Sequence, residues 1–239
     1  MESLIIHEKI KKSRLPARLD LIQSGTGLIL GLFMWVHMML VGSIVLGKGV
    51  FNFVAKTMEL SFLSSTGHGY PAAVFFAVLV IFTLFIIHAG LGMRKFPISW
   101  KQHAIFRNQM GMMKHEDTNL WYIQVVTAFI MFFLGSVHLY VMLTNPGQIN
   151  AELSAARFIT HNMWPLYLVL LFAVELHGTI GLYRLAMKWG WFDKLEWFNQ
   201  EDRGGARKYL KVLKNRLTIF FLALGLLAWL VFTVIGIRL

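Results

Sequence analysis

The sequence contains no cysteine and few charged residues, and both shortages exclude large classes of protein. Without cysteine the chain can form no disulfide, attach no haem through thioether bonds and hold no iron–sulfur cluster through its own thiolates. Any such cluster must belong to a partner. Only 15% of its 239 residues are charged and 56% are hydrophobic, which is far more apolar than a soluble domain of this length. The composition therefore favours an integral membrane protein.

The first 20 residues lack the apolar core and the small-residue cleavage site of a signal peptide, so we expect residues 1–20 to form a cytoplasmic extension. Five apolar stretches reach the roughly 20 residues that a helix needs to cross a bilayer. Polar loops separate them, and none alternates with the period of two of a membrane barrel. We expect an all-α fold, a single transmembrane domain over residues 1–239 without a self-similar repeat, with five helices at about 21–46, 71–93, 120–144, 163–187 and 217–237.

Lysine and arginine are distributed unequally between the two sides of this bundle. The N-terminal extension, the second loop and the last loop carry 19 of the 23 basic residues. The positive-inside rule then places the N-terminus in the cytoplasm and the C-terminus outside. A net charge of +11 can indicate nucleic-acid binding, but basic residues confined to one face of a membrane protein more often meet anionic lipid or an acidic partner. We therefore expect membrane lipid and no nucleic acid among its partners.

The histidines follow the predicted helices. One lies in each of the first four apolar segments: His37, His88, His138 and His177. An imidazole in hydrocarbon is costly unless its nitrogens find partners, so such residues usually face the interior of a bundle. A single one could simply bond to a neighbouring helix. Four of them, one in each of four helices, indicate a common function.

Their depths sort the four into two pairs. The first and third segments run outward, and their histidines lie 17 and 21 residues beyond the acidic residue that precedes each segment. The second and fourth run inward, with histidines six and seven residues before the arginine that follows. At about 1.5 Å per residue, the pairs lie at two levels roughly 15 Å apart.

Two imidazoles from facing helices at one level are what bis-histidine ligation of a haem requires, and two levels indicate two haems. A macrocycle also needs room beside each ligand. Gly92, Gly135 and Gly181 lie three or four residues from a histidine, on the same helix face. His37 has no such glycine. Each glycine alone could serve close helix packing, as we expect of Gly27 and Gly31, but together with the depths they favour haem.

Haem propionates need cations or hydrogen-bond donors where the helices meet the headgroups. Candidates on the inner side are Gln23, Ser24, Trp121 and Lys188, and Arg157 is a candidate on the outer side. Trp121 and Lys188 could equally belong to an interfacial belt of aromatic and snorkelling residues.

Four motifs carry a resemblance to a known family: PARLDLIQS, HAGLGMRKFPI, FLGSVHLYVML and MWPLYLVLLFAVELHGTIGLYRLAMKWGW. Their order closely resembles the dihaem cytochrome b membrane subunit of epsilonproteobacterial-type quinol:fumarate reductases, within the wider succinate dehydrogenase family. The resemblance covers almost the whole chain and is weakest in the outer loops and at the C-terminus. It implies that His37 and His138 bind a distal haem b, and His88 and His177 a proximal one, which agrees with the depths.

The resemblance also implies a function. Menaquinol would be oxidised near the outer face of the bacterial inner (cytoplasmic) membrane, and two haems would pass electrons inward. A cytoplasmic iron–sulfur subunit and an FAD-containing flavoprotein would reduce fumarate to succinate, docked on the basic inner loops, with a dimer of such heterotrimers as a candidate assembly. The same carriers can serve succinate oxidation by quinone, so the direction stays open.

Two glutamates are candidate catalytic residues. The resemblance places the quinol-site acid at Glu59, in KTMELSF, where a carboxylate could accept a proton released by the quinol. Glu175 lies in the fourth segment, two residues before His177 and turned by about 200° from it. A carboxylate in mid-membrane is a functional candidate by default. The resemblance implies that Glu175 carries protons, and a structural hydrogen bond is the alternative.

Rival classes make different predictions. A hydrogenase or formate dehydrogenase cytochrome b would place paired histidines on single helices, and a membrane di-iron enzyme would show clustered HxxxH or HxxHH motifs. Neither pattern occurs. A haem-free transporter with a histidine-lined proton or metal path would show no Soret absorbance. The glycines of GTGLILG lie within a membrane segment with the wrong spacing for a nucleotide fingerprint.

Overall fold

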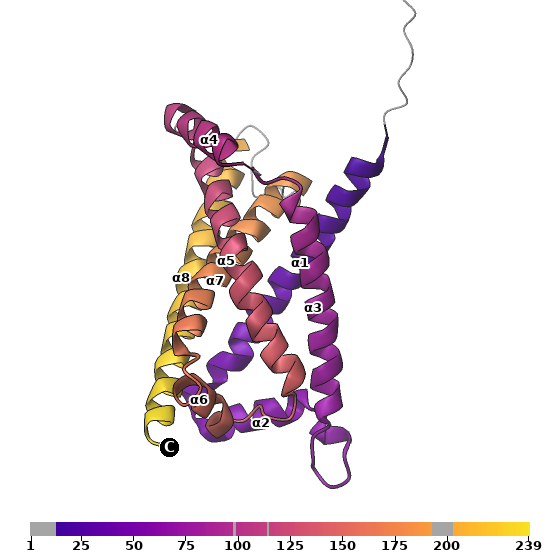
Figure 1. The fold of residues 1–239 in the computed structure, drawn as a ribbon, viewed down its shortest axis with the longest axis vertical. Coiled ribbons are helices and arrows are strands. Elements are labelled where there is room, and N and C mark those ends of the chain that lie inside the picture. Colours follow the sequence, from indigo (N-terminus) through magenta and orange to yellow (C-terminus); the bar gives the residue numbers. More distant parts are fainter. Residues whose placement is uncertain (1–12, 98, 114, 193–202) are drawn as a thin grey trace, which may run out of the picture.

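The computed structural model describes residues 13–97, 99–113, 115–192 and 203–239, and helices joined by turns and loops are the secondary structure there (Figure 1). The first 12 residues of the expected extension lie outside this description. Five of the described helices are long and apolar enough to cross a membrane, which confirms the predicted all-α class and the number of candidate spans. They are α1 (Leu15–Gly42), α3 (Pro71–Met93), α5 (Glu116–Thr144), α7 (Trp164–Trp189) and α8 (Arg203–Ile237).

Four of these helices form a ring. In the ring α1 packs against α3, α3 against α5, α5 against α7, and α7 against α1. Helix α8 lies outside the ring, against α1 and α7. The first four predicted segments, which carry the intramembrane histidines, are therefore the ones that enclose a common interior.

The prediction that only polar loops connect the spans is wrong for three connections in the described chain. They contain the helices α2 (Lys48–Met58), α4 (Trp100–Met113) and α6 (Ala151–Ile159), together with short 3-10 turns η1 (Ser43–Leu46) and η2 (Ser61–Leu63). Helices α2 and α6 each bury one apolar face, where Phe51, Ala151 and Ala155 pack in a cluster with Phe232 of α8. A search for runs of about 20 apolar residues misses them because they are short and only half apolar.

Three spans begin earlier than the apolar runs predict. Helix α8 starts at Arg203 instead of about residue 217, α1 at Leu15 instead of about residue 21, and α5 at Glu116 instead of about residue 120. The added turns of α5 and α8 are charged and bind each other, since Lys211 Nζ lies 2.6 Å from a carboxylate oxygen of Glu116 and 3.3 Å from one of Asp117. Hydropathy locates only the part of a helix that meets hydrocarbon, whereas the helix continues into the headgroup layer.

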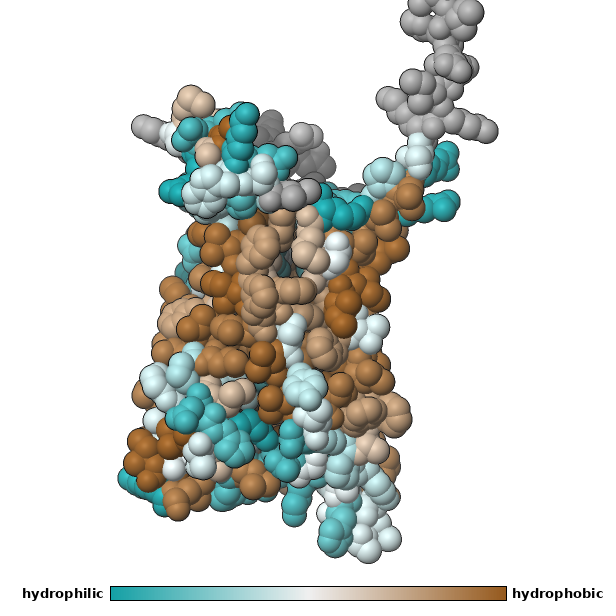
Figure 2. Space-filling model, viewed as in Figure 1, coloured by the Kyte–Doolittle hydropathy of each residue, from teal (hydrophilic) through white to brown (hydrophobic). Residues whose placement is uncertain are grey.

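The molecule has two unlike ends. We call the end with α4, the starts of α1, α5 and α8 and the ends of α3 and α7 the basic end, and the end with α2, α6 and the C-terminus the opposite end (Figure 1). Figure 2 shows hydrophobic residues across the middle of the visible face and hydrophilic ones towards both ends. This is the surface expected of a protein that spans a bilayer.

Candidate functional site

A cavity of about 880 Å³ lies inside the ring of α1, α3, α5 and α7. It is at the upper end of the range for ligand sites, about 300–1,000 Å³. Its walls are mostly apolar, and all four intramembrane histidines line it: His37, His88, His138 and His177. One continuous space therefore joins the two predicted levels.

The imidazoles meet in the predicted pairs. The ring centroids of His37 and His138 are 6.1 Å apart, and those of His88 and His177 are 6.3 Å apart. Two imidazoles that bind one metal ion from opposite sides, each at a metal–nitrogen distance of about 2 Å, have centroids about 6 Å apart. Both pairs therefore have the spacing that a bis-histidine haem iron needs.

The two pairs lie at different depths. His88 lies beside Gly27 of α1, and His37 is ten residues further along the same helix. At about 1.5 Å per residue this is about 15 Å along the helix, the separation expected from the sequence. Within the described residues no three histidine, aspartate or glutamate side chains gather as a metal site. The histidines thus meet two by two.

Small residues and an unpartnered nitrogen also fit a flat cofactor. Gly92, Gly135 and Gly181 line the cavity, as expected of glycines that leave room beside a ligand. Nδ1 of His138 is buried without a hydrogen-bond partner among the described residues. Gly27, expected only to serve helix packing, lies against the His88 ring: a Cβ there would approach His88 Cε1 to 2.8 Å.

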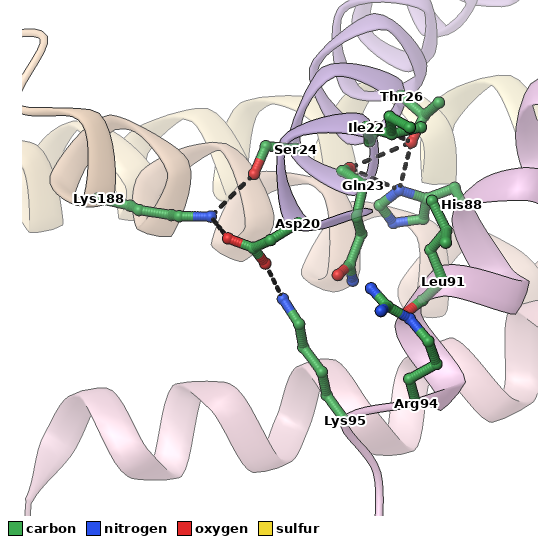
Figure 3. Close-up of polar contacts among 10 residues, drawn as sticks. All are labelled: Asp20, Ile22, Gln23, Ser24, Thr26, His88, Leu91, Arg94, Lys95 and Lys188. Atoms are coloured by element: carbon green, nitrogen blue, oxygen red, sulfur yellow. Dashed lines mark hydrogen bonds and ion pairs between the residues drawn. The ribbon is translucent and has the colours of Figure 1, made fainter. Parts of the chain in front are cut away.

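The four residues expected to hold propionates on the inner side all line the cavity: Gln23, Ser24, Trp121 and Lys188. Lys188 Nζ donates a hydrogen bond of 3.1 Å to Ser24 Oγ and forms an ion pair with Asp20. Lys95, at the end of α3, binds the other oxygen of the same carboxylate. Figure 3 shows the two ammonium groups converging on Asp20, Lys188 from α7 and Lys95 from the turn that follows α3.

Two cations at the basic end of the cavity were not identified from the sequence. Lys95 and Arg184 both line it. Arg184 Nη1 donates a 2.6 Å hydrogen bond to Gln124 Oε1 across the α5–α7 interface. From the sequence, Arg184 marked only where a helix leaves the membrane, and Lys95 counted only among the basic residues of a loop. Their position within one or two turns of an intramembrane histidine could have identified them.

At the opposite end, Arg157 of α6 lies where the sequence analysis expected a cation for a haem propionate. Its side chain is 8% exposed and lines the cavity, and Nη2 donates a 3.0 Å hydrogen bond to the backbone oxygen of Gln148. A buried guanidinium facing an apolar space needs a counter-charge, because desolvating a cation is costly. A propionate would supply one.

The two candidate catalytic glutamates do not line the cavity. Glu59 is half-buried at the end of α2, next to Met58, which does line it, and its side chain lies against Gly69. Burial raises the pKa of the Glu59 carboxyl, and the nearby Lys56 opposes this shift. Glu175 is fully buried, and both of its carboxylate oxygens lack a partner among the described residues.

The ring contains an internal correspondence of which the sequence analysis found only one part, the glycines four residues after His88 and His177. Helices α1 and α5 share the spacing Gln-x2-Thr-x10-His, from Gln23 to His37 and from Gln124 to His138, and α3 and α7 share His-x3-Gly. In space each Gln-x2-Thr faces the histidine of the neighbouring helix. The match is too sparse for a repeat search, and only the contacts reveal it.

The chain matches known proteins over most of its length. Residues 99–223 match the family described as succinate dehydrogenase/fumarate reductase transmembrane subunit. The chain is 52% identical over 219 residues to the fumarate reductase cytochrome b subunit of Wolinella succinogenes, which covers 92% of this chain and 82% of that protein. It is 48% identical over 217 residues to the fumarate reductase cytochrome b subunit of Helicobacter pylori, covering 91% and 80%.

We expect Asp20→Asn to lower the unfolding midpoint in a salt-dependent way, because one carboxylate serves the ammonium groups of two other helices. The side chains are 31–47% exposed, so each pair contributes about 0–1 kcal/mol and is screened by salt. Thermal unfolding at low and high salt measures the difference. Glu152→Gln, which removes a single ion pair with Lys48 at the opposite end, should have the smaller effect. A loss that is independent of salt would contradict the role of charge.

Proposed function

This chain belongs to the succinate dehydrogenase/fumarate reductase transmembrane subunit family, and we propose that it is the dihaem cytochrome b subunit of a menaquinol:fumarate oxidoreductase. It anchors an iron–sulfur subunit and an FAD flavoprotein at its basic end, which faces the cytoplasm of a bacterial inner membrane. Menaquinol is oxidised near the opposite end. The chain would hold two haems, which would supply one-electron carriers between the two ends, and the flavoprotein would reduce fumarate to succinate.

The observation that carries this proposal is the stacking of two histidine pairs in one cavity. Each pair has the centroid spacing of a bis-histidine metal site, and the two pairs lie about 15 Å apart along α1. A proton or metal path would need polar side chains or water along its length. The space between these pairs is instead walled by apolar residues, such as Phe85, Ala128 and Val174.

When bound, each haem b would supply an iron that changes its oxidation state by one electron. Four histidines would hold the haems: His37 and His138 at the outer level, and His88 and His177 at the inner level. At the basic end the propionates would meet Gln23, Ser24, Trp121, Lys188 and also Lys95 and Arg184, all of which line the cavity. At the opposite end they would meet Arg157.

Glu59 is the proposed proton acceptor of the quinol site. Oxidising a quinol to a quinone releases two electrons and two protons, and a carboxylate beside the site can take the first proton. The raised pKa of Glu59 makes it a stronger base than an ordinary glutamate. The sign of the pH effect follows: below this pKa the carboxyl is already protonated, so quinol oxidation slows as the pH falls through it.

Glu175 is proposed to move protons. It lies on α7 on the side away from the cavity, and Thr179, one turn later on the same face, is also buried with an unpartnered hydroxyl. A carboxylate without a partner in an apolar interior is destabilising, so a role in stability does not explain it. A proton carried past Glu175 would balance the charge of the electrons that cross the membrane.

The haem assignment predicts which histidine changes act together. We expect His37→Ala and His138→Ala each to lose the same haem, and His88→Ala and His177→Ala each to lose the other, because each change would remove one of the two histidines that hold that haem. Haem content and reduced-minus-oxidised spectra of the purified complex measure this. His161→Ala, in the turn between α6 and α7, should keep both haems. A wild-type complex without Soret absorbance would contradict the proposal, because it would contain no haem.

For Glu59 we expect Glu59→Gln to abolish menaquinol oxidation while both haem spectra persist, since the amide cannot accept a proton. Menaquinol:fumarate turnover across a pH series is the measurement. Glu152→Gln, which changes another carboxylate at the opposite end, serves as the matched control and should keep wild-type turnover. Equal turnover of the two variants would exclude Glu59 as the acceptor.

Glu175→Gln should likewise keep both haems and lose menaquinol-linked turnover. Fumarate reduction with a viologen dye, which feeds electrons directly to the soluble subunits, should remain at the wild-type rate. This second assay distinguishes a blocked proton path from a failure of assembly. Near-normal menaquinol turnover in the variant would show that Glu175 is not required to move protons.

A further inference from the structure

The imidazole of His88 is held from the neighbouring helix by two oxygens. Its Nδ1 lies 3.2 Å from the backbone oxygen of Gln23 and 3.2 Å from Oγ1 of Thr26, both on α1 (Figure 3). Gly27, the next residue, leaves the space in which the ring lies. One turn of α1 thus forms a seat for the histidine of α3.

The same arrangement occurs on the other side of the ring. Nδ1 of His177 lies 3.0 Å from the backbone oxygen of Gln124 and 3.4 Å from Oγ1 of Thr127, both on α5. Thr26 and Thr127 are both buried, at 8% and 6% exposure. Two helices therefore present the same Gln-x2-Thr turn to the two histidines of the inner pair.

The direction of these hydrogen bonds can be worked out. The single hydroxyl proton of Thr26 is directed at the backbone oxygens of Ile22, at 2.9 Å, and Gln23, at 3.1 Å. That of Thr127 is directed at the oxygens of Ile123, at 2.8 Å, and Gln124, at 3.2 Å. Both hydroxyl oxygens, like the carbonyls, can then only accept from the imidazole. Nδ1 must carry the proton, and Nε2 keeps its free lone pair.

The outer pair has no such seat among the described residues. Nδ1 of His138 is buried without a partner, and its ring meets Tyr167 edge to face, with centroids 5.6 Å apart. His37 stacks on Phe33, with centroids 5.5 Å apart. Aromatic rings restrict an imidazole but do not select which nitrogen is protonated. The Gln-x2-Thr seat therefore distinguishes the inner histidines from the outer ones.

We propose that Thr26 and Thr127 are matched positioning residues that fix the ring orientation and tautomer of His88 and His177, so that Nε2 of each faces the metal position. This role rests on the proposed function, because it presumes a haem between the two rings. A hydrogen bond from Nδ1–H to an oxygen also makes an imidazole a stronger electron donor to its metal. The seat thereby favours ferric iron at the inner level and lowers the potential of that haem.

A purely structural reading is that both threonines only satisfy their own hydroxyls. Threonines in helices often bond to the carbonyl four residues earlier. Thr83 of α3 does so with Leu79, at 2.8 Å. Its side chain is exposed, and among the described residues it forms no hydrogen bond with an intramembrane histidine. Thr83 is therefore the matched control, since it has the same local geometry without a histidine.

The test uses the purified complex with both haems. Thr26→Val and Thr127→Val keep the shape of the side chain and remove the hydroxyl. We expect each to raise the midpoint potential of the haem that His88→Ala and His177→Ala lose, and to shift the low-temperature electron paramagnetic resonance of its ferric form, while the other haem is unchanged. Thr26→Ser and Thr127→Ser, which keep a hydroxyl, should restore the wild-type values. Thr83→Val should match the wild type.

The outcomes separate this inference from the proposed function. The positioning role would be overturned if the valine variants kept the wild-type midpoint potential and paramagnetic resonance spectrum of the inner haem. It would also be overturned if Thr83→Val changed these two quantities by the same amount. If the valine variants lose the inner haem altogether, the serine variants decide. Return of the haem in the serine variants supports the positioning role. Its absence there as well means that the substitutions disturbed packing alone, and this contradicts the role. A wild-type complex without two b haems would instead refute the proposed function.

Discussion

An imidazole in the interior of a membrane must find partners for its ring nitrogens, and the four central helices are arranged around this requirement. Each inner histidine satisfies Nδ1 on a neighbouring helix, and the rings meet across an apolar cavity with 6.1 and 6.3 Å between centroids. The other ring nitrogen is left for a ligand. Helices α2, α6 and α8 then cover the ring from its end and its side, burying apolar faces against it.

Charge complements this arrangement at the basic end. Lys95, Lys188 and Arg184 line the cavity there, and each is held by a partner on another helix, Asp20 or Gln124. Such contacts both tie the helix ends together and keep cations at the mouth of the cavity. A bound propionate would compete with Asp20 for the same ammonium groups. At the opposite end, Arg157 is buried instead, and its Nη2 donates to the backbone oxygen of Gln148.

Hydropathy and the positions of single residues were enough to predict the five candidate spans, and the two pairs of histidines that meet are the two matched by depth. The short helices were not predictable in this way, because α2 and α6 owe their stability to burying one face against α8. The seats of His88 and His177 could not be predicted from the sequence either. A glutamine and a threonine three residues apart form a histidine-binding site only when the fold brings a histidine 50 or more residues away into contact with them.

The central claim is that each histidine pair binds one haem iron. Anomalous scattering at the iron absorption edge, from crystals of the purified complex, tests it most directly. We expect two iron positions among the membrane helices, one between His37 and His138 and one between His88 and His177, about 15 Å apart along the helix axes. A single iron in this region, none at all, or an iron bound away from these pairs would contradict the claim.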